Sequence, residues 1–157
     1  MKIFTSKLME GYFFENRPRP LISDKLESTF LSLPFLELQG CVFFDYLVKP
    51  ESRGRFNFHR YGNRSRCEAS VNGFHLQDFC DKKKSTIPIG FLFFEEFVKI
   101  WRRRSDENVV IYFGITPPEE EFGPDVTFTF HKKRENEIWM NLESIEKLDA
   151  AFMVVEV

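Results

Sequence analysis

The chain has 157 residues, a formal net charge of −2, 43% hydrophobic residues and 29% charged residues. This composition is typical of a globular protein, and a chain of this length buries roughly two thirds of its unfolded surface, so it needs no disulfide framework to fold. Its 20 Phe residues exceed ordinary usage, which predicts a large core built from aromatic rings.

The N-terminal segments predict short elements separated by prolines. Residues 2–14 mix apolar and polar positions, which indicates a strand followed by a turn at 16–20, where two prolines exclude a helix interior. Ser23 or Asp24 is suited to cap a short helix that ends near Leu33, because Pro34 stops it.

The next segments predict strands. Leu38–Val48 is rich in β-branched and aromatic residues, which predicts a central strand. Arg55–Tyr61 alternates between apolar and polar side chains and predicts a half-buried strand. Asn72 and Gly73 form the strongest local signal, because this pair favours the positive φ angles that a two-residue type I′ turn needs. We therefore expect a hairpin that places four apolar side chains on one sheet face: Ala69, Val71, Phe74 and Leu76.

The second half of the chain predicts one long helix and several strands. In Ile89–Arg104, Phe93, Phe97 and Trp101 recur at helical spacing, and charged residues fall largely between them. Apolar or alternating segments then predict strands at 108–115, 126–130, 137–141 and 151–157, with a short helix near 142–149. The whole pattern predicts a single domain over residues 1–157 in the α+β class, with a mainly antiparallel sheet, the helix at about 89–104 packed on it and a few short helices.

Cysteine usage and the N-terminus both favour the bacterial cytoplasm. Cys41, Cys67 and Cys80 are odd in number and lack C-x-x-C spacing, so we expect buried thiols in a reducing compartment. The N-terminus lacks the apolar stretch of a signal peptide because charged side chains interrupt it: Lys7, Glu10 and Glu15. No apolar run approaches the length of a membrane span.

Sequence motifs for catalysis are missing. The chain contains no P-loop, dinucleotide-binding glycine motif, nucleophile elbow or H-E-x-x-H motif. Cys67, His75 and Cys80 are close enough in sequence to suggest a metal site, but in the predicted hairpin Cys67 and His75 point to opposite faces. We therefore expect no metal, no cofactor and no enzymatic activity. The alternative is a small enzyme or ligand-binding domain whose apolar cavity the sequence conceals, with His59, His75 or Cys80 in its site.

Charge is divided unevenly along the chain. The net charge is −1 for residues 1–52, +7 for residues 53–104 and −8 for residues 105–157. Either the two opposed blocks pair in the fold, or each forms a patch that attracts a partner of opposite charge. The basic block, with Phe56, Phe58 and Tyr61 between its arginines, also suggests a nucleic-acid-binding module as a second alternative. A sequence pI near 6.0 argues against that alternative.

Two segments carry a resemblance. They are the acidic segment Pro117–Asp125 and a C-terminal stretch predicted as strand, helix and strand, with Trp139 in its first strand. In this general character the chain resembles the immunity proteins of bacterial contact-dependent inhibition and other polymorphic toxin systems. The resemblance implies a protein that binds a cognate toxin domain, such as a nuclease, non-covalently and blocks its active site. It places partner contacts at Glu119, Glu120, Glu121, Phe122 and Asp125, and implies neither membrane nor nucleic acid as a direct partner.

Overall fold

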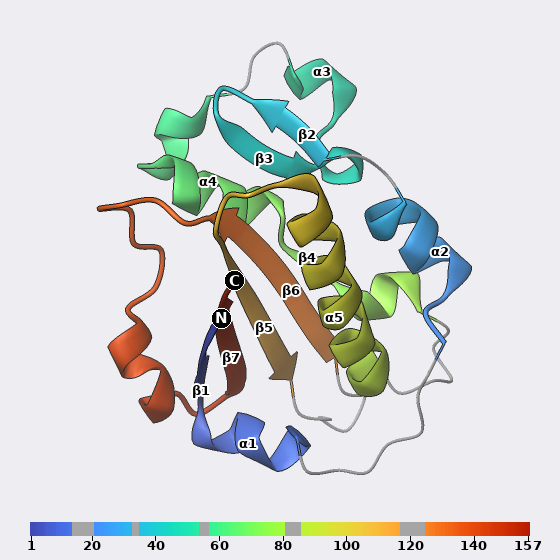
Figure 1. Cartoon of the computed structure of the whole chain (residues 1–157), viewed down its shortest axis with the longest axis vertical. Coiled ribbons are helices and arrows are strands. Elements are labelled where there is room, and N and C mark those ends of the chain that lie inside the picture. Colours follow the sequence, from blue (N-terminus) through green and yellow to red (C-terminus); the bar gives the residue numbers. More distant parts are fainter. Residues whose placement is uncertain (14–20, 33–34, 54–56, 81–85, 117–124) are drawn as a thin grey trace.

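A five-stranded antiparallel sheet with strand order β1-β7-β5-β6-β4 forms the centre of the fold (Figure 1). The computed structural model describes residues 1–13, 21–32, 35–53, 57–80, 86–116 and 125–157. The strands are β1 (Lys2–Thr5), β4 (Phe74–His75), β5 (Val109–Thr116), β6 (Asp125–Lys132) and β7 (Ala151–Glu156). This arrangement confirms the α+β class and the predicted antiparallel sheet.

The first face of the sheet is covered by α5 (Thr86–Arg104), which confirms the long helix predicted from its apolar spacing. Phe97 lies on this face with its ring centroid 5.0 Å from that of Phe128 and 4.9 Å from that of Phe130. Beside α5 lie three shorter helical segments: α1 (Lys7–Phe13), α2 (Asp24–Leu26) and the π-helical turn η1 (Glu27–Leu31). The aromatic core predicted from composition is therefore the layer between α5 and the sheet.

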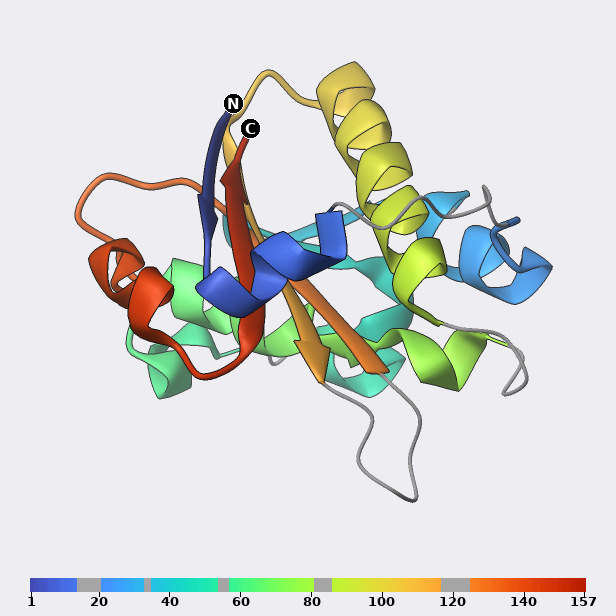
Figure 2. The ribbon, with the colours of Figure 1, turned by 90° about the horizontal axis from the view of Figure 1, so that it is seen from below.

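The second face of the sheet is covered in part by α4 (Arg64–Val71) and the 3₁₀ helix η5 (Leu142–Lys147). Ile145 of η5 is buried against Val110, Tyr112 and Val154, so η5 covers the β5–β7 part of this face. Figure 2 shows α5 and η5 on opposite sides of the sheet. Among the described residues, no helix is long and apolar enough to span a membrane.

A separate hairpin packs on α4. It consists of β2 (Phe35–Leu38) and β3 (Cys41–Phe44), joined by Gln39 with φ 52° and Gly40 with φ 79°. Positive φ at both central residues is the requirement of a type I′ turn. The prediction of a central strand at Leu38–Val48 is therefore wrong. The chain reverses at Gln39–Gly40, and β3 ends at the 3₁₀ helix η2 (Asp45–Leu47).

Helix α4 joins this hairpin to the main sheet through two buried side chains. Glu68 accepts hydrogen bonds from the N–H groups of Val42 in β3 (2.7 Å) and Lys132 in β6 (2.9 Å). Asn72 accepts one from the N–H of Phe44 (2.9 Å) and donates to the carbonyls of Val42 (3.0 Å) and Phe130 (3.2 Å). Glu68 and Asn72 thus form the hydrogen bonds that the facing backbone N–H and C=O groups of β3 and β6 need, in the place that an additional strand would occupy.

The predicted hairpin at Asn72–Gly73 is wrong. Asn63 caps α4, the helix runs to Val71, and Asn72 ends it with φ −78°. Residues that we placed on strand faces, Cys67, Ala69 and Val71, therefore lie on a helix. Only Phe74 and His75 pair with the sheet, opposite Phe128 and Thr127, and Leu76 begins the 3₁₀ helix η4 (Leu76–Phe79).

Two further strand predictions are wrong. Asn57 accepts a hydrogen bond from the N–H of His59 and starts the 3₁₀ helix η3 (Phe58–Tyr61), so the described part of 55–61 is helical. The predicted strand at 137–141 does not form: beyond Phe128 this edge of β6 is bound by side chains from α4, where Asn72 donates to the carbonyl of Phe130 and Glu68 accepts from the N–H of Lys132. The short helix α3 (Pro50–Arg53) was not predicted. The helix near 142–149 and the last strand are confirmed as η5 and β7.

Candidate functional site

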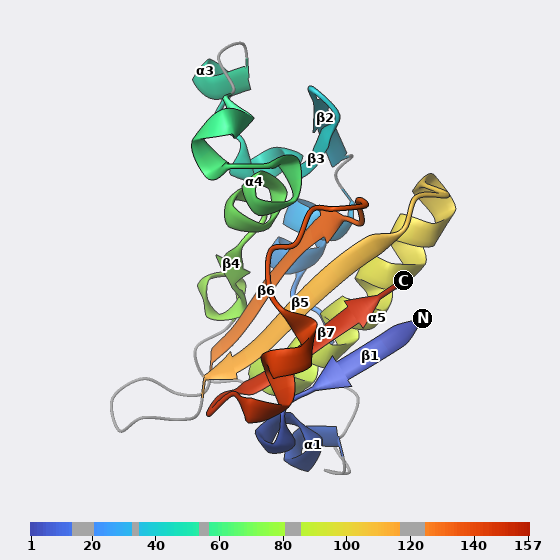
Figure 3. The same cartoon turned by 90° about the vertical axis from the view of Figure 1, so that its left-hand side faces the viewer.

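A hollow of about 350 Å³ lies on the second face of the sheet. One wall is the end of α4, at Ala69 and Gly73, and the opposite wall is Trp139, in the segment between β6 and η5. Figure 3 shows this segment passing down the face of the sheet before it reaches η5. Strand side chains from Tyr112, Thr127 and Phe152 also line the hollow, so part of the sheet surface is left uncovered here.

Aromatic rings dominate one side of this hollow. The indole of Trp139 meets the ring of Tyr112 edge to face, with 4.3 Å between the centroids, and Phe152 lies 6.3 Å from Tyr112. Trp139 and Phe152 are half-buried, so their rings are held by the fold and still partly face solvent. Such a surface is suited to receive an apolar or aromatic side chain of a partner.

A contact between a histidine and an aspartate lies at the edge of the same hollow. His75 Nδ1 contacts Asp125 Oδ2, and Asp125 Oδ1 accepts a hydrogen bond from the N–H of Gln77 at 3.4 Å. The Asp125 side chain is 9% exposed and the His75 side chain 56% exposed. A carboxylate that holds one imidazole nitrogen orients the ring, so His75 presents a fixed imidazole at the edge of the hollow.

A second imidazole, His131, is buried nearby and is structural. Tyr112 donates its hydroxyl proton to His131 Nε2 (3.0 Å), and His131 Nδ1–H donates to the carbonyl of Lys132 (2.7 Å). Burial lowers the pKa of His131 and raises the pKa of Tyr112 above its usual range, so both groups are neutral at physiological pH. This pair fixes the floor of the hollow and leaves no proton to transfer to a ligand.

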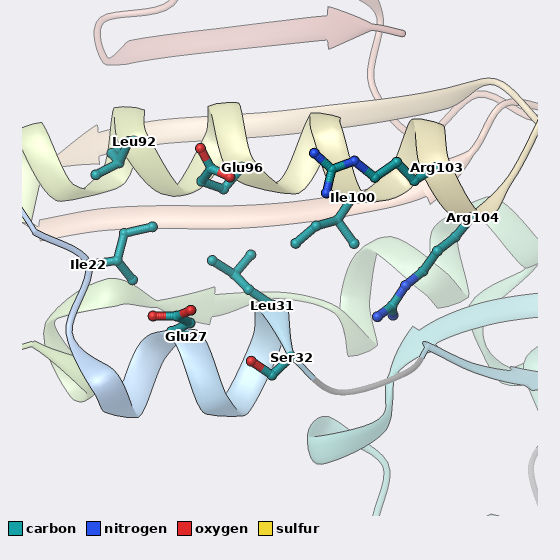
Figure 4. Close-up of a pocket in the computed structure, with 9 residues that line it drawn as sticks. All are labelled: Ile22, Glu27, Leu31, Ser32, Leu92, Glu96, Ile100, Arg103 and Arg104. Atoms are coloured by element: carbon teal, nitrogen blue, oxygen red, sulfur yellow. The ribbon is translucent and has the colours of Figure 1, made fainter.

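A larger hollow of about 580 Å³ lies on the first face, between α5 and the segment 22–32 (Figure 4). Along α5 it is lined by Leu92, Glu96 and Ile100, and Ile22 and Leu31 face α5 from the other side. Arg103 and Arg104 stand at the C-terminal end of α5, and the guanidinium of Arg104 lies 5.6 Å from the ring centroid of Phe35. Glu96 pairs with Lys99 at 2.7 Å. The groove is therefore lined by apolar side chains with the carboxylates of Glu27 and Glu96 among them and two arginines at one end.

The opposed charge blocks meet in part at α4. Arg134 of the acidic block binds the buried carboxylate of Glu68 at 2.7 Å, and Glu137 accepts a hydrogen bond from the N–H of Ser65, also at 2.7 Å. Other acidic side chains of this block remain exposed on and next to η5: Glu143, Glu146 and Asp149. The Arg134–Glu68 pair joins a cation of the acidic block to an anion of the basic block, so it does not neutralise the excess charge of either block, and exposed acidic groups remain on the side of Trp139.

The predicted partner-binding residues fall mostly in one undescribed segment. Glu119, Glu120, Glu121 and Phe122 lie outside the described residues. Asp125 is the first residue of β6 and pairs with Thr116, the last residue of β5, so the acidic segment joins two adjacent strand ends. The Asp125 carboxylate is bound by His75 and by the N–H of Gln77. Asp125 therefore fixes the end of the acidic segment to the sheet and is not an exposed anion.

The soft ligands named from the sequence are separated by the fold. Cys67 is fully buried beside Cys41, and His75 is exposed at the sheet edge. His59 is exposed on η3, and Cys80 is half-buried against the main core. Across the described ranges, no group of three His, Cys, Asp or Glu side chains is placed to hold a metal ion. The His75–Asp125 pair had no local signal, because its members are 50 residues apart.

The region that this chain shares with known proteins includes the residues that line both hollows. A family model described as the Uncharacterized protein PM0498 family matches residues 4–157. The chain belongs to this family. A relative called Uncharacterized protein PM0498, from Pasteurella multocida (strain Pm70), is 26% identical over 159 residues, which cover 97% of each chain. No solved structure matches the chain. The PM0498 family model spans every strand of the sheet except the start of β1, so the shared region includes the Trp139 hollow.

Proposed function

We propose that this member of the PM0498 family is a toxin-neutralising immunity protein that acts in the bacterial cytoplasm by binding a cognate toxin domain, such as a nuclease. The observation that carries the proposal is the Trp139 hollow with acidic side chains beside it. The hollow has partly exposed aromatic walls, and exposed carboxylates follow on η5 and just after it. The acidic segment Pro117–Asp125 directly follows Thr116, and Thr116 pairs with Asp125 across β5 and β6.

This combination of aromatic and acidic groups suits an inhibitor of a cationic enzyme. A nuclease grips phosphate groups with a positively charged groove, which the carboxylates of an inhibitor can occupy in place of the substrate. Exposed carboxylates accelerate association by electrostatic attraction, and a few desolvated aromatic side chains contribute most of the affinity. In this proposal Trp139 and Phe122 provide the aromatic contacts, and Glu119, Glu120 and Glu121 provide the attraction.

The proposal expects a toxin domain to be encoded beside this gene, and the test uses that domain. Reversing Glu119, Glu120 and Glu121 to Lys should slow association by at least about tenfold at low salt, and the difference should shrink at high salt. Trp139→Ala should instead raise the dissociation rate. Glu95→Lys is the matched control, because Glu95 is exposed on α5, on the opposite face of the sheet. Stopped-flow binding gives both rates, and wild-type rates in the triple variant and in Trp139→Ala would refute the proposed interface.

A second candidate function rests on the His75–Asp125 pair. An oriented imidazole beside an apolar hollow is also suited to bind or transform a small ligand. Native mass spectrometry of the protein purified from its host would detect such a ligand. A bound compound that is lost from His75→Gln, while Trp139→Ala leaves toxin protection intact, would favour the ligand-binding function over the immunity function.

A further inference from the structure

Two of the three cysteines share a small buried cluster of their own. Cys41 is the first residue of β3 and Cys67 lies in the middle of α4, and both thiols are fully buried. They pack with Phe43 and Val48 in a cluster separate from the main aromatic core. Cys80 belongs to the edge of the main core instead. The fold therefore brings together two thiols that are 26 residues apart in the chain.

The two thiols are in direct contact and are not equivalent. The S–H group of Cys67 donates a hydrogen bond to the sulfur of Cys41. This bond, helped by the guanidinium groups of Arg134 and Arg64, holds the pKa of Cys41 below its usual value. The same bond and burial raise the pKa of Cys67. The lowered pKa favours Cys41 over Cys67 as the sulfur that ionises, and Cys67 lies in the same buried cluster.

The backbone on both sides of the pair is held together by hydrogen bonds between β3 and α4. Val42, the neighbour of Cys41, donates its N–H to Glu68, the neighbour of Cys67, at 2.7 Å. Asn72, one turn further along α4, binds the N–H of Phe44 at 2.9 Å. A disulfide requires two Cα atoms that are close enough without backbone movement. These hydrogen bonds keep β3 packed against α4, with Cys41 and Cys67 in one buried cluster, before any oxidation takes place.

We propose that Cys41 and Cys67 form a reversible disulfide when the protein meets hydrogen peroxide. The Cys41 thiolate attacks one peroxide oxygen, the O–O bond breaks, and the hydroxide that leaves takes up a proton to give water. Cys67 then attacks the sulfur of the Cys41 sulfenic acid. The S–S bond forms as the S–O bond breaks, and the departing hydroxide leaves as water with the Cys67 proton. The two thiols are oxidised by two electrons, and one peroxide is reduced to two water molecules.

Because both thiols are buried, their oxidation is slow and selects for small oxidants. Peroxide reaches the sulfurs when the β2–β3 hairpin opens locally from α4, and a larger oxidant is excluded. Once formed, the disulfide joins the hairpin covalently to α4. This cross-link closes a loop that contains α3 and η3, and it opposes the local opening that admitted the peroxide.

The test is oxidation of the folded protein with hydrogen peroxide, followed by unfolding in denaturant and counting of the remaining thiols. The count should fall from three to one, the intact mass should fall by two hydrogens, and dithiothreitol should restore both. Peptide mapping without reduction should recover the Cys41 peptide joined to the Cys67 peptide. Cys80→Ser is the matched control and should form the same cross-link.

Single variants separate this pair from general thiol oxidation. Cys41→Ser and Cys67→Ser should each lose the cross-link, and circular dichroism of the untreated variants checks that they fold. The map of the wild-type protein decides the matter even if a variant does not fold. Three free thiols after treatment, a cross-link that includes Cys80, or sulfinic acid at Cys41 without the cross-link would each overturn the proposal.

Discussion

Replacing Arg134 with alanine tests how far the fold depends on the buried carboxylate of Glu68. Arg134 donates from Nη1 at 2.7 Å and from Nη2 at 2.8 Å to the two oxygens of this carboxylate, and from Nη2 at 2.8 Å to the carbonyl of Gly40. Glu68 is fully buried, so without the guanidinium it is an uncompensated charge held only by two backbone N–H groups. Breaking a buried pair in this way costs about 3–5 kcal/mol, a large part of the stability of an ordinary domain.

Urea unfolding measures this cost. With a slope of about 2 kcal/mol per molar urea, Arg134→Ala should lower the midpoint by about 2 M. Adding Glu68→Gln removes the isolated charge, so the double variant should be more stable than the sum of the two single changes predicts. Arg102→Ala, at an exposed position on α5, should change stability by less than about 0.5 kcal/mol. A loss of less than about 1 kcal/mol in Arg134→Ala, or additive effects in the double variant, would refute the reasoning.

Two further predictions concern pH and packing. Burial lowers the pKa of His131, so the unfolded chain binds a proton at higher pH than the native chain does, and the free energy of unfolding should fall as the pH drops below about 6.5. His131→Gln should flatten this part of the profile in urea unfolding, and an unchanged slope would contradict the assignment. A Cβ at Gly90 would lie 2.8 Å from a methyl carbon of Val126, so Gly90→Ala should lower stability by about 1–3 kcal/mol. Gly11→Ala, with nothing within 4 Å, should be neutral or stabilising by up to about 1 kcal/mol in the same urea unfolding assay, and equal effects at both glycines would count against the packing argument.

Elements with a strong apolar period were predictable from the sequence. In α5 the rings at Phe93, Phe97 and Trp101 repeat at helical spacing and are all buried, because the helix lies along the sheet. In β6 the alternation from Val126 to Phe130 matches the two faces of a strand. In these segments the local pattern and the tertiary packing require the same periodicity, so the prediction does not depend on knowing the neighbours.

Helix α4 could not be predicted in the same way, because the side chains that anchor it are polar. Glu68 and Asn72 lie one turn apart and bind backbone groups of β3 and β6, so the helix shows no apolar period. Its partners are at least 24 residues away and are known only once the fold is known. The Asn72–Gly73 pair favours a type I′ turn locally, whereas the structure uses Gln39 and Gly40 for that turn.

The candidate site was hidden for the same reason. The sequence identified the acidic segment and Trp139 but could not bring His75 beside Asp125, since a two-residue strand leaves no periodic signal. It also assigned Asp125 to the partner contacts but could not show that the Asp125 carboxylate is bound by His75 and Gln77. Exposed charges are visible in a sequence, but the side chains that neutralise some of them come from distant strands.

Helix α4 links the two proposals of this protein. One side of α4 carries Cys67 in the hairpin cluster, and the end of the same helix, at Ala69 and Gly73, forms a wall of the Trp139 hollow. The carbonyl of Ala69 accepts a hydrogen bond from Thr129 at 2.6 Å, which fixes this wall to β6 independently of the cysteines. Oxidation of the thiols should therefore stabilise the hairpin against α4 while the hollow keeps its shape. The proposed partner binding and the proposed thiol oxidation therefore involve different sides of one helix. A variant that lacks one of these properties should keep the other.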